Sequence, residues 1–156
     1  MTLLEALPQK LGSTDQWTES GGARWLDPGA LSVRALSTEM IAAHARFVTI
    51  TAYQLAGDEG IRLEYHWDLD GKLLGFPFLL KAAPGEDPKI DSIYDLTESV
   101  DWIEREIHEE YKVDFTGRDY EPLLMREGDT LGVNLREIAN ICKIEPDALG
   151  QEEVKK

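Results

Sequence analysis

A strict alternation of apolar and polar residues over positions 61–69 is the clearest pattern in the chain. Alternation with a period of two is typical of a β-strand that has one buried face. Residues 47–53 are rich in β-branched and aromatic side chains, and residues 57–60 contain the glycines and acidic residues that a hairpin loop favours. After a second turn at Asp70-Gly71, the apolar segment 73–81 predicts a further, more fully buried strand. We therefore predict three consecutive strands joined by tight turns.

Two segments near these strands have less regular patterns. Pro77 lies inside the third strand and cannot donate to a strand ladder, so we expect an edge position or a bulge there. Residues 31–36 alternate apolar and polar side chains, which predicts a first strand before the other three. Thr38 is then a candidate N-cap for a short helix that ends near Arg46.

A stripe of apolar residues at spacings of three and four predicts a helix with one buried face in residues 93–111. Leucines at helical spacing predict a short helix in residues 2–11, bent near Pro8, and the Gly-, Ser- and Thr-rich residues 12–30 predict an irregular connection. Together these elements indicate an α+β fold. It has a mostly antiparallel sheet of about four strands, helices packed on one face and an irregular C-terminal tail.

The length of 156 residues predicts one compact domain with less regular ends. We divide the chain into an N-terminal helix and irregular segment (1–30), an α+β domain (31–114) and an extended C-terminal tail (115–156). Residues 115–136 carry more apolar side chains than a free loop needs, so we expect the tail to contact a partner subunit. The alternative is that it folds back over its own sheet, with Asn134 and Glu137 capping a short helix.

The formal net charge of −14 excludes several kinds of partner. Its negative potential repels phosphate backbones and anionic lipid headgroups, so we expect neither nucleic-acid binding nor direct membrane-surface binding. The single cysteine, Cys142, can form no intramolecular disulfide, and an iron–sulfur cluster would need three more thiolates. Because no signal peptide or run of about eighteen apolar residues is found, we expect a soluble, cytoplasmic chain without membrane insertion.

Residues for catalysis or metal binding are not grouped in the sequence. His44, His66 and His108 fall on different elements, with no further ligand at metal-binding spacing. Glu106 and Glu110 share one helix face, but the neighbouring carboxylates point elsewhere, which favours a solvated charged face over an acid–base pair. With no phosphate loop or dinucleotide motif either, we predict no catalytic, cofactor or metal residues and favour a scaffolding role. The alternatives are a stand-alone acidic metal-dependent enzyme and an acidic inhibitor protein.

One motif resembles a known family. Residues 102–106 read Trp-Ile-Glu-Arg-Glu, and a Phe-x-Gly stretch follows at residues 115–117. The 30-kDa-type subunits of respiratory complex I carry a similar helix and a similar following stretch, and the resemblance covers residues 31–136 or so. The sequence departs from the family pattern at Lys112, where the family has Gly, and in residues 118–123. Such divergent tails resemble the membrane-bound energy-converting [NiFe] hydrogenase branch.

This resemblance implies a non-catalytic scaffold subunit in the soluble arm of a membrane-bound oxidoreductase complex. Its partners would be the large catalytic subunit of an energy-converting [NiFe] hydrogenase and the small iron–sulfur subunit. The iron–sulfur clusters and the nickel–iron centre would lie in those partners, with no cofactor in this chain. The complex would hold the chain at the inner face of the cell membrane. An equivalent subunit of an NADH/ferredoxin:quinone oxidoreductase is the alternative.

The same resemblance supplies the predicted partner interface. Arg105 is its central residue, because a planar guanidinium can bond a partner carboxylate or backbone in a bidentate way. An internal pair with Asp101 or Glu109 one turn away is an equally weighted alternative. Trp102 either caps the core or anchors the contact. The complete predicted interface comprises Trp102, Glu104, Arg105, Glu106, Phe115, Gly117 and Arg136.

Overall fold

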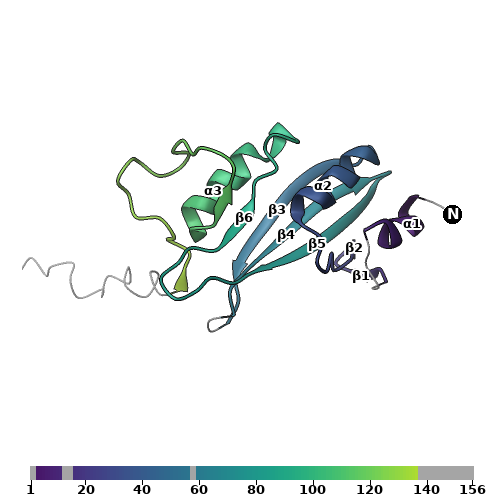
Figure 1. Cartoon of the computed structure of the whole chain (residues 1–156), viewed down its shortest axis with the longest axis horizontal. Helices are drawn as coiled ribbons and strands as arrows, with labels where there is room; N and C mark the ends of the chain where they lie inside the picture. Colours follow the sequence, from purple (N-terminus) through teal and green to yellow (C-terminus); the bar gives the residue numbers. More distant parts are fainter. Residues whose placement is uncertain (1–2, 12–15, 57–58, 137–156) are drawn as a thin grey trace, which may run out of the picture.

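The computed structural model describes residues 3–11, 16–56 and 59–136. A five-stranded sheet forms its centre, with the strand order β1-β2-β5-β4-β3, and a separate two-stranded sheet joins β6 to β7 (Figure 1). The elements in chain order are α1 (Leu3–Lys10), β1 (Thr18–Ser20), β2 (Ala23–Trp25), α2 (Val33–Ala42), β3 (Arg46–Gln54), β4 (Ile61–Leu69), β5 (Lys72–Leu80), β6 (Lys89–Asp91), the 3₁₀ helix η1 (Glu98–Val100), α3 (Asp101–Tyr111) and β7 (Asp114–Thr116).

The predicted three-stranded meander and the α+β class are confirmed. β3, β4 and β5 pair antiparallel in succession, and alternate residues of β4 are buried along its whole length. β3 lacks such a regular pattern because its register with β4 shifts between Phe47 and Thr49. This irregularity leaves Val48 partly exposed, while Phe47 and Ile50 both enter the core.

Pro77 lies at a local edge of the sheet, as predicted. β2 runs parallel to β5 but pairs only with Leu74 and Gly75. Beyond Gly75, β5 has a paired neighbour only on the β4 side, where Pro77 stands opposite Glu64. The missing N–H of proline therefore removes no bond to β2.

The predicted first strand in residues 31–36 is wrong, because the chain is already helical from Val33. Ser32 is the N-cap, and its Oγ accepts a hydrogen bond from the backbone N–H of Ala35 at 3.2 Å. Thr38 lies inside α2 instead of capping it. The buried residues of α2, which are Val33, Leu36, Ser37 and Met40, follow a helical repeat that outweighs the short alternation before them.

Other element boundaries also differ from the expectation. Residues 18–25, predicted as irregular, form the β1–β2 hairpin and join the main sheet. The predicted helix in residues 93–111 is confirmed only from α3 onward, since residues 93–97 form turns and residues 98–100 form the 3₁₀ helix η1. Just before them, residues 89–91 form β6 and pair in parallel with β7. Ile93 and Val100 are nevertheless fully buried. The apolar stripe therefore identified core side chains correctly, although the backbone that carries them is not α-helical. Glu137 and the helix predicted to follow it lie outside the described residues.

The buried apolar side chains of the described residues form one core between the sheet and its helices. The buried face of β4 contributes Tyr65 and Trp67, α2 contributes Leu36 and Met40, and Ile107 comes from α3. α2 and α3 lie on the same side of the sheet (Figure 1). The opposite face of β4 is polar and is linked to its neighbours by side-chain bonds such as Tyr53 to Glu64.

Close packing of Gly75 against Trp25 gives a test of the β2–β5 junction. A Cβ on Gly75 would come within 2.5 Å of the Trp25 ring, so we expect Gly75→Ala to lower the free energy of unfolding. The loss should be about 1–3 kcal/mol, which is typical of overpacking. Urea unfolding of a double-mutant cycle checks the cause, because the same change in a Trp25→Ala background should cost much less. Equal losses in both backgrounds would contradict the proposed clash.

Candidate partner-binding site

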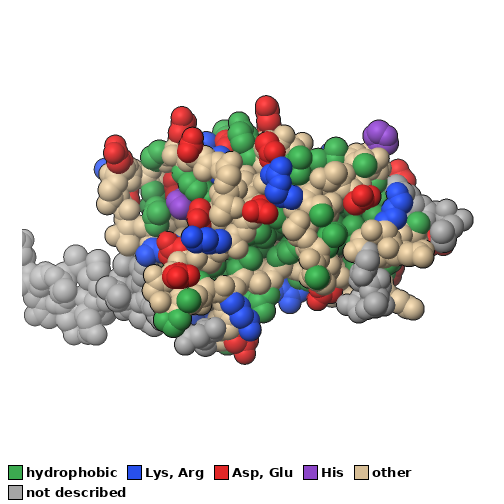
Figure 2. Space-filling view, viewed as in Figure 1, with side chains coloured by type: hydrophobic (Ala, Val, Ile, Leu, Met, Phe, Trp, Pro, Cys, Tyr) green, Lys and Arg blue, Asp and Glu red, His purple; other side chains and the backbone are tan. Residues whose placement is uncertain are grey.

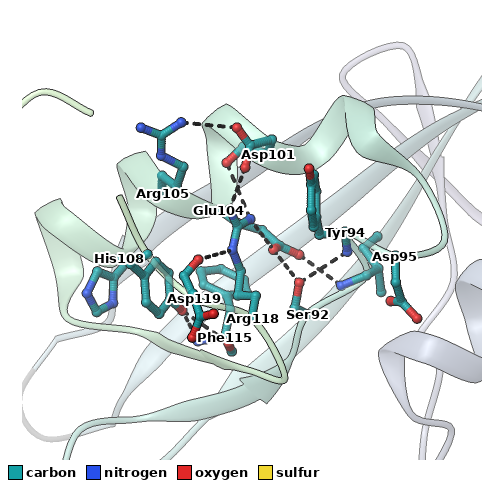
Figure 3. Close-up of polar contacts among 12 residues, drawn as sticks. Ser92, Tyr94, Asp95, Asp101, Glu104, Arg105, His108, Phe115, Arg118 and Asp119 are labelled. Atoms are coloured by element: carbon teal, nitrogen blue, oxygen red, sulfur yellow. Dashed lines mark hydrogen bonds and ion pairs between the residues drawn. The ribbon is translucent and has the colours of Figure 1, made fainter. Parts of the chain in front are cut away.

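Glu104 lies on the inner side of α3 and is fully buried, although it belongs to the motif that is predicted to face a partner. Its Oε1 accepts a hydrogen bond from the Ile93 N–H at 3.0 Å. Its Oε2 accepts bonds from the Ser92 hydroxyl at 2.6 Å and from Arg118 Nη1 at 2.9 Å (Figure 3). A buried carboxylate is tolerated only when it is paired and hydrogen-bonded in this way.

Arg118 brings the chain after β7 back to α3. Its side chain is only 6% exposed and forms ion pairs with both Glu104 and Asp101. The guanidinium also lies over the rings of Tyr94 and Tyr120, at 4.9 and 5.5 Å from their centroids. Burial raises the pKa of Asp101, but hydrogen bonds from Arg118 and Arg105 outweigh it, so the pKa is lowered.

Arg105 holds the next part of the C-terminal segment, which we define as residues 117–136. Its Nε and Nη2 donate to the carbonyls of Glu121 and Pro122, both at 2.9 Å. Its Nη1 donates to Asp101 Oδ2 at 3.1 Å. This is the internal ion pair, one helical turn away, that the sequence indicates as the alternative to an interface role. Arg105 therefore fixes an irregular backbone by planar, multidentate bonding that a lysine could not reproduce.

Glu109, one turn further along α3, holds the same segment through its N–H groups. Its carboxylate accepts hydrogen bonds from three successive amides, those of Leu123 at 2.6 Å, Leu124 at 2.8 Å and Met125 at 3.1 Å. Burial raises the pKa of Glu109, but the three backbone bonds outweigh it and the pKa is lowered. The pair Arg105 and Glu109 thus binds carbonyls with one side chain and amides with the other.

Further contacts continue along the segment. Tyr120 stacks on His108 at a centroid distance of 3.8 Å, and its hydroxyl bonds the backbone of Phe115. Near the end of α3, the Asn134 side chain donates to Glu110 Oε2 at 2.9 Å. The tail therefore follows α3 of its own chain, whereas the alternative for residues 115–136 placed it over the sheet. Whether it also contacts a partner subunit stays a prediction.

The predicted interface residues are found in several different environments. Trp102 is 72% exposed, which excludes the core-capping alternative for its side chain. Glu104 and Phe115 are fully buried, so in this structure their side chains serve the protein's own core. Glu106 is half-buried, and Gly117 is exposed after β7 with a φ of +86° that favours glycine. The interface role of all these residues, and of Arg136 discussed next, stays a prediction.

Arg136 lies apart from the other predicted residues. Its backbone N–H donates to Gln54 Oε1 at 2.8 Å, at the end of β3. The structure therefore brings Glu104 and Arg105 together through Asp101 and Arg118, and it places Arg136 elsewhere.

Sequence reasoning missed two residues that organise this site, Glu109 and Arg118, and it did not predict the burial of Glu104. Glu109 is buried, so the expectation of a solvated acidic face is wrong for Glu104 and Glu109. The sequence contained one indication that Glu104 is buried. Glu104 stands four residues after Val100 and three before Ile107, within the apolar stripe of the helix. No comparable signal marked Arg118, since its partners lie 14 and 17 residues away along the chain.

The described residues contain no group of three or more His, Cys, Asp and Glu side chains that could hold a metal ion. Within the same ranges, none of the helices has the length and apolar character needed to cross a bilayer. The bonds from Arg105 and Glu109 hold a backbone segment in one conformation.

Fold and site together define a small α+β domain whose buried charges order an irregular segment along one helix. The family described as respiratory-chain NADH dehydrogenase, 30 kDa subunit, matches residues 32–141. The chain belongs to this family, which confirms the resemblance inferred from the motif. It also confirms, at this level, the predicted class of a subunit of a respiratory oxidoreductase complex.

Two solved structures have a similar fold. A trypsin-resistant fragment of Nqo5 is 19% identical, with a TM-score of 0.56 over 76% of this chain and 98% of the fragment. A chain from an archaeal membrane-bound sulfane sulfur reductase, a respiratory membrane complex, is 15% identical, with a TM-score of 0.62 over 97% of both chains. A search of curated proteins found no match.

The buried ion pair yields a first test of this site. Arg118→Ala leaves Glu104 buried without its cation, so we expect it to lower the free energy of unfolding by about 3–5 kcal/mol. Urea unfolding measures the loss. The double substitution Glu104→Gln and Arg118→Met removes both charges and should recover much of it. If the double variant is no more stable than Arg118→Ala, the unpaired charge is not the cause.

The pKa directions of Asp101 and Glu109 predict a loss of stability in acid. A carboxyl whose folded-state pKa is lowered stabilises the fold above its unfolded pKa, and this contribution disappears as the pH falls through the folded-state value. Between about pH 5 and pH 2, the amides of Leu123, Leu124 and Met125 should therefore lose hydrogen-exchange protection before those of β4. In Glu109→Gln this early loss should already be present at neutral pH. Simultaneous loss in both regions would contradict the prediction.

Proposed function

We propose that this chain is a non-catalytic scaffold subunit that docks on the catalytic large subunit of a membrane-bound, energy-converting [NiFe] hydrogenase. The small iron–sulfur subunit of the same complex is its second partner. The clusters and the nickel–iron centre belong to those subunits. The chain lies peripherally in the cytoplasmic arm, at the inner face of the cell membrane.

The observation that carries this proposal is the ordered C-terminal segment on α3. Arg105 and Glu109 bond five backbone groups of residues 121–125, although this stretch has no regular secondary structure. Leu124 is held in the middle of these bonds and is 62% exposed. A backbone fixed before binding loses less conformational entropy on association, so exposed side chains on it make effective contacts.

Two further points support the proposal. The sequence belongs to a family of respiratory-complex subunits. A structural neighbour that matches almost the whole chain belongs to a membrane-bound sulfane sulfur reductase, a respiratory membrane complex. The equivalent position on the large subunit of an NADH/ferredoxin:quinone oxidoreductase is the second candidate.

Arg105→Ala tests the docking. Without Arg105, residues 121 and 122 lose their anchor, so we expect about tenfold weaker association with the large subunit while the isolated chain stays folded. Pull-down or interferometry measures the affinity, and circular dichroism checks the fold. Arg105→Lys should not restore binding, because an ammonium cannot bond both carbonyls and Asp101 in one plane.

Arg46→Ala is the matched control, since Arg46 is exposed and pairs with Asp68 on β4, away from α3. If Arg105→Ala binds as well as Arg46→Ala, docking through this segment is refuted.

Binding to a hydrogenase large subunit but not to a quinone-reducing one would decide between the two candidate partners. A metal-dependent activity of the isolated chain that Glu106→Gln abolishes would instead favour the stand-alone enzyme. Salt-sensitive binding to an unrelated basic protein would favour the inhibitor.

A further inference from the structure

Trp102 is the most exposed of the large hydrophobic side chains in the described residues. The side chains of Trp17, Trp25 and Trp67, by contrast, all pack against other parts of the protein. A single exposed apolar residue is common on protein surfaces and proves nothing by itself. The charges around Trp102 make it unusual.

Glu98 and Glu106 stand four residues before and four residues after Trp102. Glu106 lies one turn after Trp102 on the same face of α3, and Glu98 lies on η1, the 3₁₀ helix that runs directly into the start of α3. Neither carboxylate has an ion pair with any basic side chain that the structure describes. The nearest cations on this helix and segment are already engaged, Arg105 by Asp101 and Arg118 by Asp101 and Glu104.

The protein itself shows what such a combination binds. Arg118 lies between two carboxylates and over two aromatic rings, and there both its charge and its flat face are satisfied. Trp102 offers the same two elements, an aromatic face and flanking carboxylates, but on the outside of α3. In the space-filling view, acidic side chains project over the part of the molecule that contains α3 (Figure 2).

We propose that Trp102, Glu98 and Glu106, together called the Trp102 site, receive an arginine side chain of the partner subunit. The guanidinium lies over the indole and bonds the two carboxylates. Arginine fits better than lysine because its planar, weakly hydrated group can stack and form bidentate bonds at once. The net charge of −14 complements a basic partner segment. The inference rests on the proposed function, because it names the chemistry by which the partner is recognised.

Binding of the full-length chain to the large subunit gives the first test. We expect Trp102→Ala to weaken binding about tenfold or more, as expected for an interface hot spot, and Trp102→Phe to weaken it less. Glu98→Gln with Glu106→Gln should weaken binding and reduce its salt dependence. Leu79→Ala is the control, since Leu79 is 50% exposed but lies on β5. Trp102→Ala binding with the affinity of Leu79→Ala would overturn the inference.

A peptide titration separates this inference from the proposed function. The probes are an arginine-rich peptide and a lysine-rich peptide of equal length and charge, added to the full chain. The indole N–H signal of Trp102, assigned from its absence in Trp102→Phe, should shift more with the arginine peptide at the same ionic strength. Equal shifts with both peptides, or none, would overturn the Trp102 site.

The two tests fail in different ways. If the wild-type chain binds no large subunit, the proposed function fails, and the peptide titration still decides whether the Trp102 site recognises arginine. If the large subunit binds equally well to wild type and to Trp102→Ala, the function stands and the inference fails.

Discussion

The buried pairing of Glu104 with Arg118 is the constraint that holds α3, the loop after β6 and the C-terminal segment together. A carboxylate in the core costs several kcal/mol unless it is paired and hydrogen-bonded, so the chain must bring donors to it from elsewhere. These donors are Ser92 and Ile93, just after β6, and Arg118, just after β7. Arg34 of α2 bonds the Ser92 carbonyl and Asp95, which ties α2 to the same loop. One buried charge therefore joins three separate parts of the chain.

The side chains of α3 fall into two groups, those that stabilise the fold and those that are exposed to solvent. Its inward side buries Ile107 and Glu104, while the side chains of Arg105 and Glu109 bond the backbone of the C-terminal segment. Trp102, with Glu106 one turn further, faces outward. Because the inward and lateral contacts fix the helix and its attached segment, the outward residues are held in place before any partner arrives. Such preorganisation fits the proposed scaffold role, because residues that are fixed before binding lose less conformational entropy on association.

The departures from the family pattern have local physical explanations. Lys112 occupies the left-handed position that ends α3, with a φ of 55°, where glycine avoids a cost of about 1 kcal/mol. Its aliphatic stem lies close to Gly132, so the side chain gains packing against the C-terminal segment. Arg118 begins the divergent stretch 118–123, yet it is the residue that neutralises Glu104. The divergent residues are thus integrated into the site.

By itself the sequence determined the α+β class, the β3–β5 meander and the family, because alternation in β4 and the motif of residues 102–106 are local patterns. It misassigned residues 31–36, where a short alternation concealed a helical repeat that a few more residues reveal. Only the tertiary structure decided that Glu104 and Glu109 are buried and that Arg105 bonds backbone carbonyls. Their partners lie 11 to 17 residues away, in irregular segments that no periodicity describes. The sequence alone does not tell whether a charged side chain is exposed to solvent or buried in the core. Burial becomes possible only when the fold brings hydrogen-bonding and oppositely charged groups within bonding distance.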